Sequence, residues 1–124
     1  MNVWSGVITK NLEASKAFYI RLFGCAVIYE SDWFVLLKLG NRELGFMLPN
    51  LETQASIFQS GFEGKGIWIT LDVDDVDAEY DRIKAMNVPI EVELRDEPWG
   101  DRHFAFVDPN GIGIDIVQKR SIEA

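Results

Sequence analysis

The stretch WITLDVDDVDA, residues 68–78, repeats the pattern of an earlier stretch, WSGVITKNLEA, residues 4–14. Each begins with a tryptophan and ends with an alanine, and Asp75 takes the place of Asn11 in between. An internal repeat of this kind indicates two small modules in tandem, neither of which is large enough to close a core of its own.

Both copies of the repeat predict a strand that leads into a helix. Alternating side chains predict strands over residues 2–9 and 67–73. Helices are expected over residues 12–23 and 76–86, where apolar side chains recur at helical spacing.

Small polar residues and glycine mark the ends of both expected helices. Asn11 and Asp75 are expected N-caps, because a short side-chain oxygen can accept a hydrogen bond from a free backbone N–H of the first turn. Gly24 and Asn87 stand where a left-handed residue commonly ends a helix.

Three strand-like runs follow each helix, so each half of the chain reads βαβββ. The runs are 25–31, 33–39 and 42–47 in the first half and 89–94, 102–107 and 112–118 in the second. The expected fold class is therefore α+β, with two tandem βαβββ modules. We expect a single domain over 1–124, with modules at 1–48 and 67–120 and a connector at 49–66 that carries one helical turn near 51–58.

Composition limits the classes of partner and compartment. The chain has 20 acidic and 12 basic residues and a formal net charge of −8, which argues against nucleic-acid binding and is compatible with a cationic or neutral small ligand. No apolar run approaches the roughly 20 residues that a membrane helix needs. The N-terminal residues lack a signal-peptide pattern, and the single cysteine, Cys25, suits a reducing, cytoplasmic compartment and a small buried role.

Metal chemistry is also limited, because the chain has one histidine and one cysteine. A structural zinc site usually needs four such ligands, which one subunit cannot supply. Any metal site would have to be built mainly from aspartate and glutamate.

The two modules resemble those of the vicinal-oxygen-chelate superfamily, which includes glyoxalase I, extradiol dioxygenases, fosfomycin-modifying enzymes and bleomycin-resistance proteins. The matching motifs are NLEASKAFY at 11–19, DVDDVDA at 72–78, EPWGDRHF at 97–104 and DPNGIGIDIVQ at 108–118. The resemblance implies a cupped mixed sheet with the helices on its outer face and a ligand in the cup.

Enzymes of this superfamily usually hold one divalent metal in the cup, with ligands from the first and last strands of each module. By resemblance, the first-strand positions fall on Trp4 and Trp68, and the last strand of the second module offers Asp115. The last strand of the first module, at residues 44–46, offers no donor. One carboxylate among four positions does not fix a metal, because indole provides no usable lone pair.

The chain is therefore most similar to the metal-free, bleomycin-resistance-like branch. We expect it to bind a small molecule in an aromatic-lined cup, with no metal or other cofactor. The more specific expectation is that this ligand is a cationic, partly planar antibiotic. The alternative is a divalent-metal-dependent lyase, isomerase or dioxygenase with substituted ligands. A third interpretation is an interaction module whose aromatic side chains fill the cup or a subunit interface.

Six residues are candidates for ligand binding. They are Trp4, Trp68, Trp99, Asp115, Arg102 and Phe34. The indoles could stack on a planar or cationic group, or simply plug the cup. Asp115 alternates with isoleucines and would face the cup, where it could pair with a cationic ligand or with Arg102.

Trp99 lies in a turn-prone Pro-Trp-Gly segment, which suits either a ligand or a dimer contact. His103 shares strand parity with Ala105 and Val107, so a packed strand histidine is favoured over a general base. We expect a homodimer, because half-cups of this kind leave sheet edges to cover.

Overall fold

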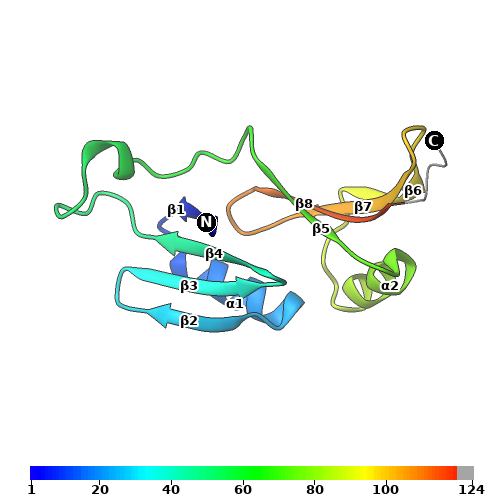
Figure 1. Cartoon of the computed structure of the whole chain (residues 1–124), viewed down its shortest axis with the longest axis horizontal. Helices are drawn as coiled ribbons and strands as arrows, with labels where there is room; N and C mark the ends of the chain where they lie inside the picture. The colour runs from blue at the N-terminus through cyan, green and yellow to red at the C-terminus, as the bar shows by residue number, and fades with distance from the viewer. Residues whose placement is uncertain (120–124) are drawn as a thin grey trace. The chain divides into compact units, whose positions relative to one another are not determined.

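The structure, a computed structural model, describes residues 1–119. The chain divides into two compact units, Met1–Glu63 (unit 1) and Gly64–Ala124 (unit 2). Each unit is a βαβββ module with one helix and one four-stranded mixed sheet, which confirms the predicted α+β fold of two tandem modules (Figure 1).

Unit 1 contains β1 (Ser5–Ile8), α1 (Leu12–Phe23), β2 (Ala26–Glu30), β3 (Phe34–Leu39) and β4 (Arg42–Met47). Its strands lie in the order β1-β4-β3-β2. β1 and β4 are parallel, with Gly6 opposite Gly45, and the other neighbours are antiparallel.

Unit 2 repeats this plan with β5 (Trp68–Asp72), α2 (Val76–Ala85), β6 (Val92–Asp96), β7 (Asp101–Val107) and β8 (Gly113–Lys119). The strand order is β5-β8-β7-β6. β5 and β8 are parallel, with Thr70 opposite Asp115. Since Thr70 takes the place of Gly6 in the sequence repeat, Gly45 is the unit 1 counterpart of Asp115.

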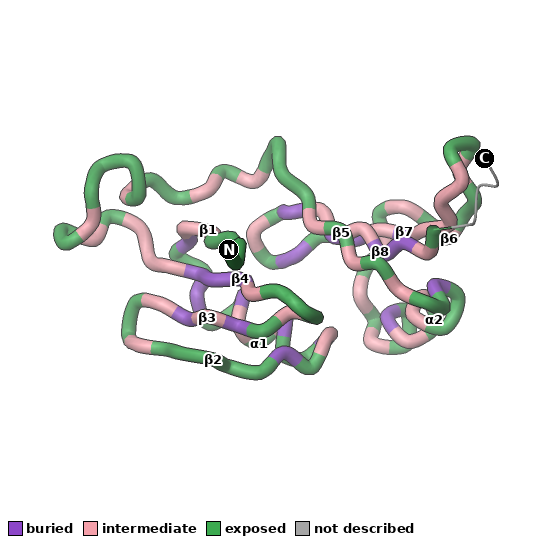
Figure 2. Tube along the Cα trace, in the orientation of Figure 1, coloured by how far each residue is buried: buried purple, intermediate pink, exposed green. Residues whose placement is uncertain are grey.

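One helix covers one face of each sheet and forms the core with it. In unit 1, Tyr19 and Leu22 of α1 are buried with Leu37 of β3 and Phe46 of β4, and the buried part of the trace lies where α1 meets these strands (Figure 2). In unit 2, the equivalent core contains Val76, Ile83, Phe104, Phe106, Ile114 and Ile116. Because strand residues alternate between faces, the remaining strand side chains point to the other face, which we call the open face.

The predicted helix boundaries agree closely with the structure, and two strands differ. α1 spans the predicted residues, and Gly24 and Asn87 both have left-handed backbone angles, as expected for these helix ends. β1 is shorter than predicted, and β6 begins at Val92 instead of residue 89.

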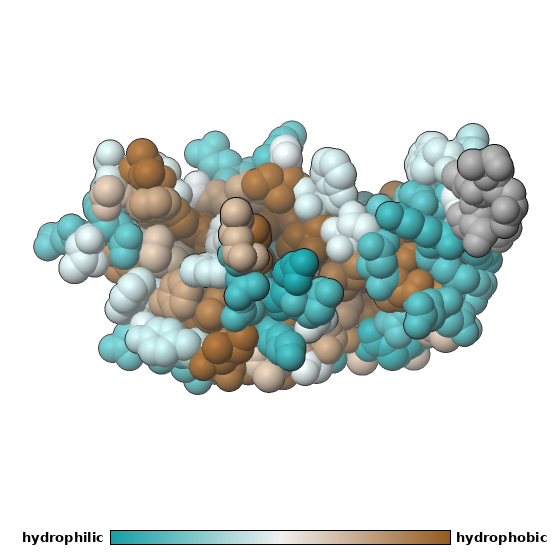
Figure 3. All heavy atoms as spheres, in the orientation of Figure 1, coloured by the Kyte–Doolittle hydropathy of each residue, from teal (hydrophilic) through white to brown (hydrophobic). Residues whose placement is uncertain are grey.

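The connector carries one turn of 3₁₀ helix, Ser56–Phe58, within the stretch predicted to be helical. Ile57 and Phe58 of this turn are exposed, and apolar surface gathers there at the upper left of Figure 3. Within residues 1–119, no helix combines the length and the hydrophobicity that crossing a membrane would require.

The two helix N-termini differ and provide a matched test of capping. The Asp75 side chain accepts a hydrogen bond from the backbone N–H of Ala78 at 3.1 Å, whereas the Asn11 side chain makes no cap hydrogen bond, so its predicted role was wrong. Instead, Thr9 Oγ1 accepts a hydrogen bond from the Asn11 backbone N–H.

We therefore expect Asp75→Ala to lower the free energy of unfolding by about 1 kcal/mol, because a first-turn N–H loses its acceptor. Asn11→Ala is the control and should change stability by much less. Urea denaturation followed by circular dichroism measures both, and equal losses for the two variants would contradict this assignment of the caps.

Candidate ligand-binding site

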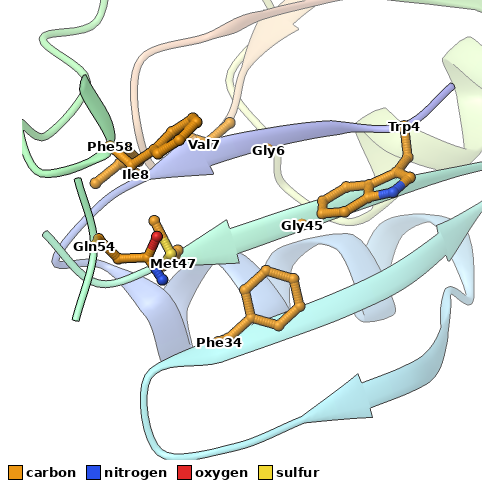
Figure 4. Close-up of a pocket in the computed structure, with 9 residues that line it drawn as sticks. All are labelled: Trp4, Gly6, Val7, Ile8, Phe34, Gly45, Met47, Gln54 and Phe58. Atoms are coloured by element: carbon orange, nitrogen blue, oxygen red, sulfur yellow. The ribbon is translucent and has the colours of Figure 1, made fainter. Parts of the chain in front are cut away.

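A pocket of about 380 Å³ lies on the open face of unit 1. Its lining is almost entirely apolar, and Figure 4 shows the side chains around it. The lining residues are Trp4, Gly6, Val7, Ile8, Phe34, Gly45, Met47, Gln54 and Phe58. They come from β1 and the residue before it, from β3 and β4 and from the connector, so the whole lining belongs to unit 1.

Trp4 and Phe34 form the aromatic end of this pocket (Figure 4). Their rings meet edge to face, with centroids 6.2 Å apart. Both rings lie over Gly45, where an added Cβ would come within 3.0 Å of Trp4 Cζ3 and 3.3 Å of Phe34 Cζ. A side chain at this position of β4 would therefore force the two rings to shift.

The connector closes the opposite end of the pocket with Gln54 and Phe58 (Figure 4). The segment is tied down by backbone hydrogen bonds, including Asn50 N–H to the Gln59 carbonyl at 2.8 Å and Phe62 N–H to the Ile8 carbonyl at 2.8 Å. Strands therefore form the floor of the pocket, and the connector crosses one end of it. We call the part of the connector that carries Gln54 and Phe58 the strap.

The open face of unit 2 is different, because it is polar. Trp68 is 69% exposed, and its Nε1 donates a hydrogen bond to Thr70 Oγ1 at 2.9 Å. Asp115 lies on the same face, beside Thr70 in the neighbouring strand. Trp68 and Asp115 thus share a face, as the sequence predicted for them. The open face of unit 2 carries charged groups, whereas the open face of unit 1 carries an apolar pocket.

His103 joins two carboxylates on this face. Its Nδ1 lies 2.6 Å from Asp115 Oδ1, and its Nε2 lies 2.8 Å from Glu97 Oε2, which also accepts a hydrogen bond from Arg95. Both ring nitrogens can donate only when the imidazole is protonated. Because both ring nitrogens are engaged, His103 is poorly placed to act as a general base. The sequence favoured a packed strand histidine over a general base, and the partners of this histidine are carboxylates and not apolar side chains.

The pKa values of this cluster follow from the same contacts. Burial alone would lower the pKa of His103, but hydrogen bonds to Asp115 and Glu97 outweigh burial and raise the pKa above its usual value. The hydrogen bond from His103, with a smaller contribution from Arg95, lowers the pKa of Glu97.

A group whose pKa is raised by folding stabilises the fold below its unfolded pKa and loses this contribution as the pH rises through the folded pKa. We therefore expect His103→Ala to lower the free energy of unfolding by about 1 kcal/mol at pH 6, because two carboxylates lose a charged donor. The loss should shrink as the pH is raised toward 9 and His103 of the wild type loses its proton. Urea denaturation at both pH values measures it, and a loss that is independent of pH would contradict the charged pair.

Arg102 does not lie on this face of the sheet. Its guanidinium pairs with Asp77 at 2.8 Å and with Asp96 at 3.4 Å, and it lies on the face of β7 that also carries Phe104. An ion pair between Arg102 and Asp115 was one of the two alternatives for Asp115, and it does not form. In the register of β7 with β8, Arg102 lies opposite Gln118 and Asp115 opposite Ala105, so the two side chains point to opposite sides of the sheet.

Trp99 lies in the turn between β6 and β7 and is exposed. Its Nε1 donates to Asp101 Oδ2 at 3.0 Å, which fixes the ring near the start of β7. It is not among the residues that line the unit 1 pocket.

The described residues do not fit the divalent metal that the resemblance implies. Trp68 has no donor for a metal, Gly45 stands at the unit 1 counterpart of Asp115, and both nitrogens of His103 are already engaged. Within residues 1–119, no three His, Cys, Asp or Glu side chains are grouped so that they could hold a metal ion.

Sequence reasoning placed Trp4 and Phe34 among the candidate site residues but missed Gln54 and Phe58. These two lie in the connector, which has weak periodicity, and only long-range folding brings them over β1 and β4. Glu97 was also missed, although its spacing from the single histidine in the motif at 97–104 is a usable signal.

Comparison with known proteins gives one family and a shared fold. The family model described as the glyoxalase/bleomycin resistance protein/dioxygenase superfamily matches residues 3–116. No curated protein is similar enough to this chain to count as a match.

Three solved structures illustrate the shared fold. A lactoylglutathione lyase from Agrobacterium tumefaciens is 24% identical, with a TM-score of 0.77 over 95% of this chain and 92% of that one. A glyoxalase/bleomycin resistance protein/dioxygenase from Nocardioides is 19% identical, with a TM-score of 0.83 over 99% and 85%. A bleomycin-binding protein solved with bleomycin is 19% identical, with a TM-score of 0.70 over 97% and 99%.

Proposed function

Because the chain belongs to the glyoxalase/bleomycin resistance protein/dioxygenase superfamily, we propose that it binds a small molecule with a flat, largely apolar ring and that it does so without a metal ion. The observation that carries this proposal is the pair of Trp4 and Phe34 rings over Gly45. In unit 1 this glycine stands at the counterpart of Asp115, so aromatic rings occupy space that a donor side chain would need.

The size and the lining of the pocket support a drug-sized or smaller ligand. Its volume of about 380 Å³ lies within the range of roughly 300–1,000 Å³ that is typical of ligand sites. Aromatic walls hold a flat ring by offset or edge-to-face contacts, each worth about 0.5–1.5 kcal/mol beyond the buried area.

The specific candidate is a cationic antibiotic of the bleomycin type. A protein of the same fold was solved with bleomycin bound, and the net charge of −8 favours a cationic ligand. On the polar open face of unit 2, we propose Asp115 and the exposed indole of Trp68 as the residues that would contact a cationic group.

Intrinsic tryptophan fluorescence tests both levels of this proposal. The protein is titrated with bleomycin, with other glycopeptide antibiotics and with small flat aromatic compounds that carry no charge. Saturable quenching by flat compounds supports the general proposal, and micromolar quenching by bleomycin supports the specific one. If no glycopeptide causes a change at micromolar concentration, the antibiotic assignment is wrong.

A homodimer is the oligomeric state we propose, in a reducing, cytoplasmic compartment. The edge strand β2 is exposed along its whole length (Figure 2) and carries the apolar side chains of Val27, Ile28 and Tyr29, a surface that a second strand or subunit would cover. The buried free thiol of Cys25 suits the compartment. Sedimentation equilibrium tests the dimer, and a monomer at 100 times the ligand-binding concentration would exclude it.

A further inference from the structure

The side chain of Gln54 brings a primary amide to an apolar pocket. It extends from the connector toward Met47, while Trp4 and Phe34 lie toward the other end (Figure 4). Of the nine lining residues, Gln54 alone offers both a hydrogen-bond donor and a hydrogen-bond acceptor on its side chain.

Within residues 1–119, the side-chain amide of Gln54 makes no hydrogen bond to another protein group. The hydrogen bonds of this residue involve only its own backbone N–H and carbonyl. The Gln54 side chain is half-buried. No fully buried side-chain polar atom among the described residues lacks a hydrogen-bond partner, so the free amide of Gln54 is not fully buried. The amide therefore remains open to the pocket space. A polar group placed at an apolar wall is costly to cover unless the ligand that covers it forms hydrogen bonds with it.

The backbone that carries this amide is fixed. Gln54 N–H donates to the Leu51 carbonyl at 3.0 Å. Gln59 Nε2 donates to the Gln54 carbonyl at 2.8 Å and to the Leu51 carbonyl at 3.0 Å. The strap thus holds the base of the Gln54 side chain while leaving its tip available, which is the arrangement expected of a group that selects a ligand.

We propose that Gln54 selects ligands whose flat ring carries a cyclic amide, or an equivalent edge with one donor beside one acceptor. The side-chain carbonyl accepts from the ligand N–H, and the side-chain NH₂ donates to the ligand carbonyl, while the ring lies against Trp4 and Phe34. This inference rests on the proposed function and specifies the ligand class of that pocket.

Two probes of the same shape separate the amide edge from the ring. 2-Quinolinone has a flat bicyclic ring with an N–H beside a carbonyl, and 1-methyl-2-quinolinone has the same ring without the N–H. We expect the wild type to bind 2-quinolinone about tenfold more tightly, because the methylated probe leaves the Gln54 carbonyl without a donor. Titration followed by ¹⁵N–¹H NMR measures both affinities, and the side-chain NH₂ signal of Gln54 should shift with 2-quinolinone.

Gln54→Leu keeps most of the side-chain volume and removes the amide. In this variant the two probes should bind within a factor of about two of each other, with the affinity for the methylated probe retained. Thr53→Val is the matched control, because Thr53 is exposed, adjacent in sequence and outside the pocket lining. It should keep the tenfold preference.

The outcomes separate the two proposals. A preference that is the same in the wild type and in Gln54→Leu overturns the role of Gln54 and leaves the aromatic pocket in place. Failure of both probes to bind the wild type at millimolar concentration overturns the pocket as a ring-binding site, and the selection by Gln54 with it.

Discussion

Replacing Trp4 with alanine is expected to weaken ligand binding about 100-fold, because a ring that closes one end of the pocket is lost. This factor corresponds to about 2.7 kcal/mol, which is the order expected when a tryptophan that packs directly on the ligand is truncated. Isothermal titration calorimetry, with the ligand that quenches most strongly in the fluorescence panel, measures the change without depending on indole emission.

Trp99→Ala is the matched control for this variant. It removes an indole of similar exposure that lies in unit 2 and makes no contribution to the pocket lining. Binding should fall by less than about threefold. If Trp99→Ala weakened binding as much as Trp4→Ala, the ligand would not be held mainly in the unit 1 pocket.

Gly45→Val is expected to weaken binding about 30-fold by filling the floor of the pocket. Even a single Cβ at this position would lie 3.0 Å from Trp4 and 3.3 Å from Phe34, so the two rings must move apart. Gly45 does not have a left-handed backbone angle, and valine is favourable in a strand. The loss should therefore come from the pocket and not from the backbone.

Gly113→Val provides the comparison in unit 2. A Cβ there would meet Trp68 Cβ at 3.6 Å, an ordinary contact, and the position is outside the pocket. Calorimetry should give wild-type affinity for Gly113→Val, with circular dichroism spectra unchanged for both variants. Wild-type affinity in a folded Gly45→Val protein would show that the floor over Gly45 does not contact the ligand.

The fold was largely predictable because its signals are local. The repeat of Trp4 and Trp68 predicted two βαβββ modules, and the helix ends at Gly24 and Asn87 depend on backbone angles that few other residues tolerate. The errors fell where local signals compete. Asn11 offered a cap, but Thr9 and Ser15 supply the polar side chains that bond to its backbone.

The site was less predictable, because its parts depend on long-range packing. Strand alternation placed Asp115 on the open face, but it could not show that His103 would reach across from β7 to Asp115. Arg102 is adjacent to His103 in sequence and lies on the opposite face, where Asp77 of α2 and Asp96 of β6 hold it. The strap with Gln54 has no periodic pattern, so only the folded chain reveals its position over the pocket.

One matched position distinguishes the open faces of the two modules. Parallel pairing puts Gly45 and Asp115 at matching positions, and the two open faces differ accordingly. Where the carboxylate stands, a histidine and a second carboxylate gather around it. Where glycine stands, aromatic rings pack over the strand and leave an apolar pocket beside them.

Calorimetric titration of chelator-stripped protein, repeated after addition of nickel, manganese, iron or zinc, tests the central claim most directly. The account predicts saturable binding of a flat aromatic ligand to the stripped protein, with an affinity that changes by less than about twofold when each metal is added. Binding that appears only after a metal is added would contradict it, because the ligand would then depend on a coordination site and not on the aromatic pocket.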